Sequence, residues 1–304
     1  MDVIRRGSEV LRNRVGGQLF AQVAGPDGPK NRERIHQTPG PRWFGPERPI
    51  RVVHGDAAMF VGGLRALLLQ SLHPLAMAAV AAHSGFRGDP WGRLARTSTF
   101  LAVTTYGTAD DAGRAVAQVR AVHARVTGSA EDGRPYRADD PHLLAWVHAA
   151  EVDSFLAAHQ AFGAHPLSPP ECDAYVRDTA RIATALGAAQ PPLDVEQLRG
   201  VLDGFRPELR ATAAARDAAR FIVKEPPLPR AVRVPYKALT ANAVALMPEW
   251  ASSALGLPTA PRFLTPLTAP LTRRSGDVVT GLIRWAMAPP ASSRTPPAPP
   301  GPDR

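Results

Sequence analysis

The feature that most constrains this fold is an apolar stretch from Ala57 to Ala82, which approaches the length of a membrane span. The stretch is interrupted by Arg65, Gln70, His73 and Pro74. Polar and charged side chains are costly in lipid, and a proline inside a helix removes a backbone hydrogen bond. We therefore expect a buried core helix that is kinked or broken at the proline. Peripheral association with a membrane stays open.

Helical signals dominate the rest of the chain. No segment shows a sustained alternation of apolar and polar residues, and β-branched runs between turns are scarce. Residues that cap helices stand before and after several apolar segments. Helices are predicted from Asp140 to Gly163, from Ser168 to Gly187, from Asp194 onward, within 207–223 before Pro226, and from Asp110 or Asp111 to Gly128. This pattern favours one all-α domain over about residues 50–285.

Composition narrows the class of protein. Hydrophobic residues make up 44% and charged residues 21%, which is typical of a folded chain. The net charge is +9, but the arginines are spread out without a dense basic run or interleaved aromatics, so we expect no nucleic-acid partner. The single Cys172 excludes an internal disulfide and a cysteine metal cluster. With no secretory signal in the first residues, we expect a cytoplasmic protein.

Familiar catalytic motifs are absent, which leaves histidine chemistry. The sequence has no phosphate-binding glycine loop, no GxSxG and no HExxH. His123 lies among valines in a predicted helix, with Arg120 one turn earlier. Arg93, Arg96 and Thr97 form an R-x-x-R-T cluster on the preceding helix. One neutral imidazole with nearby arginines in an apolar helical pocket suits haem, the imidazole binding iron and a guanidinium binding a propionate or bound oxygen.

Simpler interpretations stay open beside that one. A buried histidine is most often neutral and hydrogen-bonded within the protein. His73 can bond backbone groups freed at the proline kink, and Glu151 can orient His148. The arginines of the cluster can cap helices or pair with Asp89, Asp110 and Asp111. From the residues alone, structural and cofactor-binding roles are both possible.

Several motifs in the same order resemble one known family. They are WFGPERPIRVVHGD, LRALLLQSLHPLAMAAVAAHSGFRGDPWGRLARTSTFLAVTTYG, VRAVHARVTG, GRPYRADDPHLLAWVHAAEVDSFL and LSPPECDAYVRDTARIATALG. Together they resemble the DUF2236 family, also called the MpaB oxygenase or latex-clearing-protein catalytic domain family, over roughly residues 42–285. The resemblance implies a globin-like all-α bundle around a haem pocket, with haem b held by one proximal histidine and oxygen bound on the distal side.

The resemblance also assigns roles to residues. His123 matches the proximal iron ligand, and Arg120 matches its accompanying arginine. Arg93 and Thr97 match the arginine and threonine near the distal haem face, where they are the expected catalytic residues. Arg96 stands where the rubber-cleaving branch has a lysine, and we group it with them.

Two further positions bear on the resemblance. His148 matches another histidine of the family pattern, and we expect it to contribute to cofactor binding without a ligand role. The rubber-cleaving members use a glutamate as catalytic base, but residues 57–88 contain no carboxylate, and Met77 stands about where the glutamate is expected. A base must lie within hydrogen-bond reach of the proton that it removes. His83, His73 or the substrate itself are the alternatives.

These observations predict a haem b-dependent oxygenase that acts on an apolar, terpenoid or lipid-like substrate with dioxygen. The alternatives are a non-catalytic haem-binding sensor or storage protein, and a helical protein without haem. The predicted domains are a wrapping N-terminal segment (1–41), the oxygenase domain (42–285) and a Pro/Ser-rich disordered tail (286–304).

Overall fold

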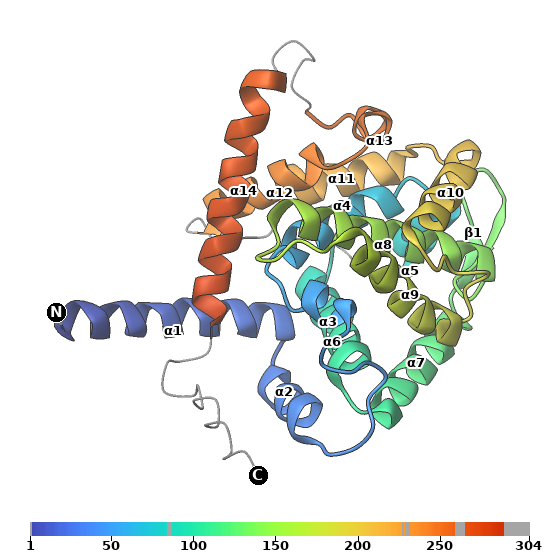
Figure 1. Cartoon of the computed structure of the whole chain (residues 1–304). Helices are drawn as coiled ribbons and strands as arrows, with labels where there is room; N and C mark the ends of the chain where they lie inside the picture. The colour runs from blue at the N-terminus through green and yellow to red at the C-terminus, as the bar shows by residue number, and fades with distance from the viewer. Residues whose placement is uncertain (1, 84–86, 227, 229–231, 259–264, 289–304) are drawn as a thin grey trace.

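The computed structural model describes residues 2–83, 87–226, 228, 232–258 and 265–288, and the chain is 72% helical (Figure 1). This confirms the predicted all-α class. The helices of the described residues are α1 (Asp2–Ala24), α2 (Gly28–Gln37), α3 (Pro49–His54), α4 (Met59–Gln70), α5 (Pro74–His83), α6 (Pro90–Tyr106), α7 (Ala109–His123), α8 (Pro141–Phe162), α9 (Pro169–Leu186), α10 (Val195–Phe205), the 3₁₀ helix η1 (Arg206–Glu208), α11 (Ala213–Lys224), α12 (Arg233–Ala245), α13 (Glu249–Ala254) and α14 (Thr265–Met287).

The long apolar stretch folds as expected. It forms α4 and α5, which are separated by a break before Pro74 and bent by 108°. Arg65 is buried in spite of its charge, because its guanidinium pairs with Asp153 at 2.7 Å and donates to the Ser154 hydroxyl. No single helix of the described residues is long and apolar enough to span a membrane, although the bent pair α4 and α5 meets that test by combined length and composition.

Local capping signals place several helix ends where the sequence predicts them. Asp140 accepts from the His142 amide at the start of α8. Ser168 and Glu171 form a reciprocal capping box before α9, and Gly187 ends that helix with φ +99°, a value that favours glycine. Asp194 caps α10 through the Gln197 amide.

Two predicted helix boundaries are wrong. The cap of α7 is the Thr108 hydroxyl, while Asp111 is buried and receives hydrogen bonds from Arg34 and Arg114. The same helix ends at His123 and does not reach Gly128. Residues Thr127–Ser129 instead form β1, which pairs antiparallel with β2 (Pro135–Arg137) in a small hairpin. The hairpin packs against α5. This tertiary contact is not predictable from the local sequence.

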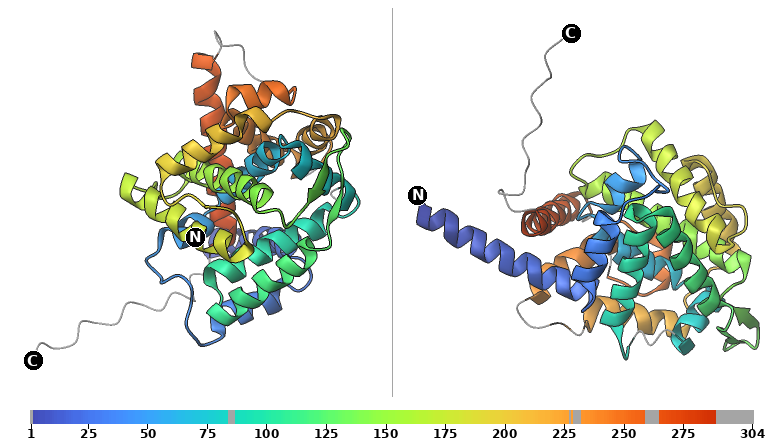
Figure 2. Two further views of the ribbon diagram at one scale, coloured as in Figure 1. Left: turned by 90° about the vertical axis from the view of Figure 1, so that its right-hand side faces the viewer. Right: turned by 90° about the horizontal axis from the view of Figure 1, so that it is seen from below.

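The helix predicted within 207–223 is confirmed in part. Its first residues form η1, and the α-helix α11 begins only at Ala213, where the Thr212 hydroxyl caps the Ala215 amide. The N-terminal residues are more helical than their glycine and proline content suggests. Among them, α1 extends outward from the body and packs against α6 and α14 (Figure 2). Of the predicted disordered tail, residues 286 and 287 instead end α14, and the part from position 289 onward lies outside the described residues.

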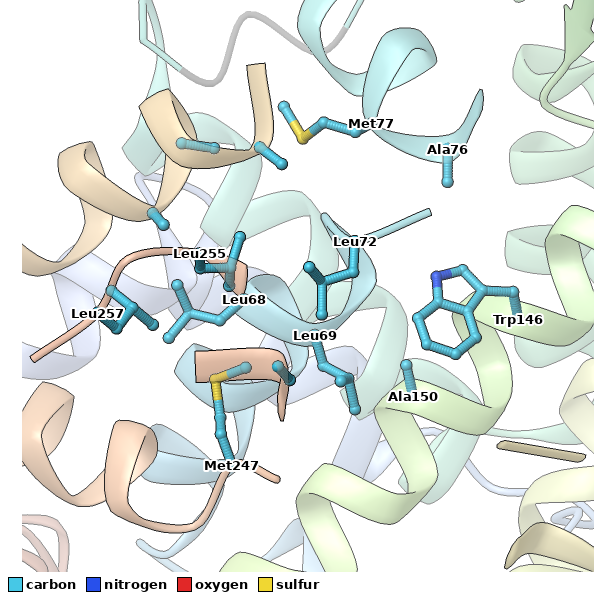
Figure 3. Close-up of a cluster of buried hydrophobic side chains, with 14 of the residues drawn as sticks. Leu68, Leu69, Leu72, Ala76, Met77, Trp146, Ala150, Met247, Leu255 and Leu257 are labelled. Atoms are coloured by element: carbon cyan, nitrogen blue, oxygen red, sulfur yellow. The ribbon is translucent and has the colours of Figure 1, made fainter. Parts of the chain in front are cut away.

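The core forms around α4, which packs closely against α8 and also contacts α12 (Figure 1). One cluster joins leucines of α4 to Trp146 of α8 and to the region of α13, with Met77 of α5 at its edge (Figure 3). A second cluster joins α3, α8 and α9 around Tyr175, and a third joins α4, α8, α12 and α14. The close approach of α4 and α8 depends on Gly62, because a Cβ there would lie 2.8 Å from Cδ1 of Phe155.

Candidate functional site

An antiparallel helical hairpin brings the two central motifs together. The packed helices α6 and α7 are joined by only Gly107 and Thr108. Arg93 lies 13 residues before the end of α6, and His123 lies 14 residues after the start of α7. At 1.5 Å per helical residue, each is about 20 Å from the turn. The motifs therefore lie at the same end of the hairpin.

His123 is the last residue of α7, and its side chain is partly buried. Burial lowers the pKa of His123, and the charge of Asp139 opposes that shift only in part. Within the described part of the chain, its ring nitrogens form no hydrogen bond. The ring is thus neutral at pH 7 and has a nitrogen lone pair to offer to a ligand. The neighbouring Val122 is 46% exposed, so the helix end is less enclosed than its apolar sequence predicts.

The arginine–threonine cluster is divided between buried and exposed side chains. Arg93 is partly buried, and burial together with the positive charge of Arg96 lowers its pKa. Arg96 and Thr97 are exposed, and Arg96 pairs with Asp89 at 3.3 Å, as the simpler interpretation allows.

The side chain of Arg120 does not share the partly buried position of His123. It is exposed, and its guanidinium donates to the carbonyl of Ala185 in α9 at 3.1 Å. One edge of its guanidinium therefore joins α7 to α9.

His148 and Glu151 lie one turn apart on α8, and both side chains are partly buried. The Nε2 atom of His148 is buried and has no hydrogen-bond partner, and burial lowers the pKa of this ring to about 4. Burial raises the pKa of Glu151 to about 7. No hydrogen bond joins the two side chains in the described structure, so the expected orientation of His148 by Glu151 is not seen. An unpaired buried nitrogen is costly and indicates an unfilled interaction.

A buried polar cluster next to these residues was missed from the sequence. Nδ1 of His54 lies 2.8 Å from the Thr105 hydroxyl, and Nε2 lies 3.4 Å from the hydroxyl of Tyr175. Burial lowers the pKa of His54 to about 3. Burial, followed by the charge of Glu151, raises the pKa of Tyr175. The cluster joins α3, α6, α8 and α9, and no spacing in the sequence indicates it.

The position of the expected catalytic glutamate holds no proton acceptor. Met77 is 2% exposed and packs in the core cluster of Figure 3. His83 is exposed and bonds to the hydroxyl of Tyr136 at 3.1 Å. His73 belongs to a separate group, with His142 and Glu208, in which three possible metal-ligand atoms lie within 4.8 Å of one another.

Two curated proteins are similar in sequence to about half of this chain. Two mycobacterial proteins, the uncharacterized protein Mb2261 of Mycobacterium bovis and the uncharacterized protein Rv2237 of Mycobacterium tuberculosis, are each 33% identical over 170 residues. The aligned part covers 53% of this chain and 64% of each relative, so the chain spans less than two thirds of their length. No solved structure matches it significantly.

A family model gives the broadest match. Residues 51–285 match the model described as ER-bound oxygenase mpaB/B'/Rubber oxygenase, catalytic domain. This range begins within α3 and ends within α14, and it includes the hairpin of α6 and α7, the helix α8 and the buried polar cluster. The chain therefore belongs to the family of the mpaB/B' and rubber oxygenase catalytic domains.

Proposed function

We propose that this protein is a haem b-dependent oxygenase that uses dioxygen to oxidise an apolar, terpenoid or lipid-like substrate, with His123 as the iron ligand. The observation that carries the proposal is the state of His123. Its imidazole is partly buried, neutral and without a hydrogen bond in the described structure, and it lies at the hairpin end that also bears Arg93. Membership of an oxygenase family supports the same conclusion.

The available donor groups fit haem. A neutral imidazole is a common axial ligand, and no thiolate competes, because the single cysteine is buried and lies 3.8 Å from the Leu167 carbonyl. Arg93 is partly buried at the same end of the hairpin and adds a positive charge beside the proposed cofactor. The unpaired Nε2 of His148 is a second polar atom that a bound group can satisfy. When bound, haem would supply an iron that binds and activates dioxygen.

The remaining roles belong to side chains of α6, α7 and α8. Arg93 and Thr97 orient dioxygen, and Arg96 contributes positive charge at the exposed rim. Arg120 holds α7 against α9 and thereby fixes the helix that carries His123. His148 contributes to the cofactor pocket from α8.

Proton transfer requires another group, because Met77 has no acidic or basic atom. Of the described carboxyl groups with a resolved shift, Glu151 has its pKa raised toward neutrality, to about 7, by burial. A base whose pKa lies near the working pH is effective in proton transfer. We therefore include Glu151 in the proposed site as the proton acceptor.

Absorption spectra test the iron ligand. Wild-type protein reconstituted with haem should give a Soret band that shifts with carbon monoxide, and His123→Ala should lose haem or change its coordination. His165→Ala is the matched control, because that side chain is exposed. A wild-type spectrum in His123→Ala together with haem loss in His148→Ala would move the ligand to α8. Wild-type protein that stays colourless would refute the haem proposal, and a six-coordinate iron without substrate turnover would favour a sensor or storage protein.

A further inference from the structure

Three side chains from distant parts of the sequence point their ligand atoms at one place. His73 stands at the break between α4 and α5, His142 in the first turn of α8, and Glu208 at the end of η1. Nε2 of His73 lies 3.3 Å from Oε2 of Glu208. Nε2 of His142 lies 2.9 Å from Oε1 and 3.1 Å from Oε2 of the same carboxylate. All the ligand atoms are within 4.8 Å of one another.

These separations are close to those around a small metal ion. A tetrahedral zinc ion with nitrogen and oxygen ligands at about 2.1 Å separates its ligand atoms by roughly 3.4 Å. The two histidine–glutamate distances, 3.3 Å and 2.9 Å, already approach this value. Small side-chain rotations are therefore enough to place a metal ion between the three groups.

The backbone around the site is held by independent contacts. The His142 amide is fixed by the Asp140 carboxylate at 2.8 Å. The segment after η1 is tied to the helix break, because the Arg210 amide donates to the Leu72 carbonyl at 2.9 Å. The ring of Phe205 packs against that of His142 with 4.6 Å between centroids. The ligands therefore start close to a binding geometry, which reduces the entropy lost on binding.

Burial divides the site into a closed side and an open side. The His73 side chain is 1% exposed, whereas those of His142 and Glu208 are 56% and 38% exposed. A metal ion held here would be anchored in the protein on one side and reachable by water on the other. Two histidines and one carboxylate are a ligand set that zinc uses in proteins, with water in the fourth position.

We propose that His73, His142 and Glu208 bind one divalent transition-metal ion of the zinc type, with water completing the coordination. The ion links the α4–α5 break, the start of α8 and η1, and so stabilises the folded chain by mass action. Both Nε2 atoms must offer a lone pair to the metal, so each neutral ring holds its proton on Nδ1, and in His73 this requires a shift of the proton from Nε2 to Nδ1. That shift loses only a 3.5 Å hydrogen bond from the Ala76 amide, at the outer limit for such a bond. The proposal does not depend on haem.

Zinc binding to the full-length, chelator-treated protein tests the proposal. Calorimetry with zinc chloride should give one ion per chain, and zinc should raise the melting temperature. His142→Ala and Glu208→Gln should each weaken binding by about tenfold or more, because each removes a ligand or its charge. His165→Ala, which removes an exposed imidazole elsewhere, should bind as the wild type does.

Two further measurements keep the outcomes distinct. Cobalt in place of zinc should give the visible absorption bands of a tetrahedral site, and these should be absent from Glu208→Gln. Far-UV circular dichroism in chelator should be the same for all variants, since His142 and Glu208 are exposed. Absence of one-to-one binding in the wild type, or equal affinity in the wild type and His142→Ala, would overturn the proposal whatever the haem spectra show.

Discussion

Replacing Glu151 with glutamine should stabilise the protein at pH 8 and leave its stability almost unchanged at pH 4. The side chain is partly buried, and burial raises the pKa of its carboxyl group from 4.5 to about 7. In the unfolded chain the same group ionises near its ordinary value. Between these two pKa values the folded protein binds more protons than the unfolded chain, so the free energy of unfolding falls as pH rises.

The size of this effect follows from the two pKa values. Since one pKa unit corresponds to about 1.4 kcal/mol, the rise from 4.5 to about 7 makes the ionised group cost roughly 3.5 kcal/mol in the folded protein. Glutamine has nearly the same shape and cannot ionise. The stability difference between variant and wild type should therefore grow through the range pH 4.5 to 7 and then level off.

Urea unfolding of the haem-free protein, followed by circular dichroism at pH values from 4 to 8.5, measures this difference. The matched control is Glu196→Gln, which alters an exposed carboxylate in α10 and should give no such pH-dependent gain. A constant difference between Glu151→Gln and wild type across this range would mean that the carboxyl group is not held in a desolvated site. In that case it would also be a poor candidate for the proton acceptor.

Three substitutions test the packing around the site by urea unfolding at pH 7. Gly62→Ala should destabilise the protein by about 1–3 kcal/mol, because its Cβ would meet the Phe155 ring at 2.8 Å; an unchanged midpoint would show that α4 and α8 separate freely. Trp146→Ala should cost about 3–5 kcal/mol, since the side chain is 1% exposed in the main core cluster, and a loss below about 1 kcal/mol would contradict that packing. Asp178→Asn should cost roughly 1–2 kcal/mol by weakening the 2.9 Å bond from Nε of Arg48, whose side chain is 42% exposed; a stabilised variant would argue against that pair.

Short-range signals explain which predictions about the fold succeeded. Pro74 has no backbone N–H to continue the hydrogen bonds of α4, and Asp140, Ser168 and Gly187 satisfy backbone groups within a few residues of themselves. These effects need no partner from elsewhere in the chain, so the all-α class and several helix ends were predictable. The order of the motifs likewise indicated the family, which the match over residues 51–285 confirms.

Long-range contacts explain what the sequence did not predict. The end of α7 at His123 follows from strand pairing with Pro135–Arg137, and the approach of Arg34 from a distant part of the chain takes Asp111 into an ion pair. Burial raises the pKa of Glu151 on α8, and the charge of this group in turn raises the pKa of Tyr175 on α9.

The sequence by itself determined that this chain folds into capped helices around a broken apolar core and which family it belongs to, because both depend on residue order. Only the tertiary structure decided which charged and polar groups lose contact with water. It left the Nε2 of His148 unpaired and brought His73, His142 and Glu208 within reach of one another. Desolvation and ligand geometry arise from the packing of segments far apart in the chain, so spacing along the sequence does not specify them.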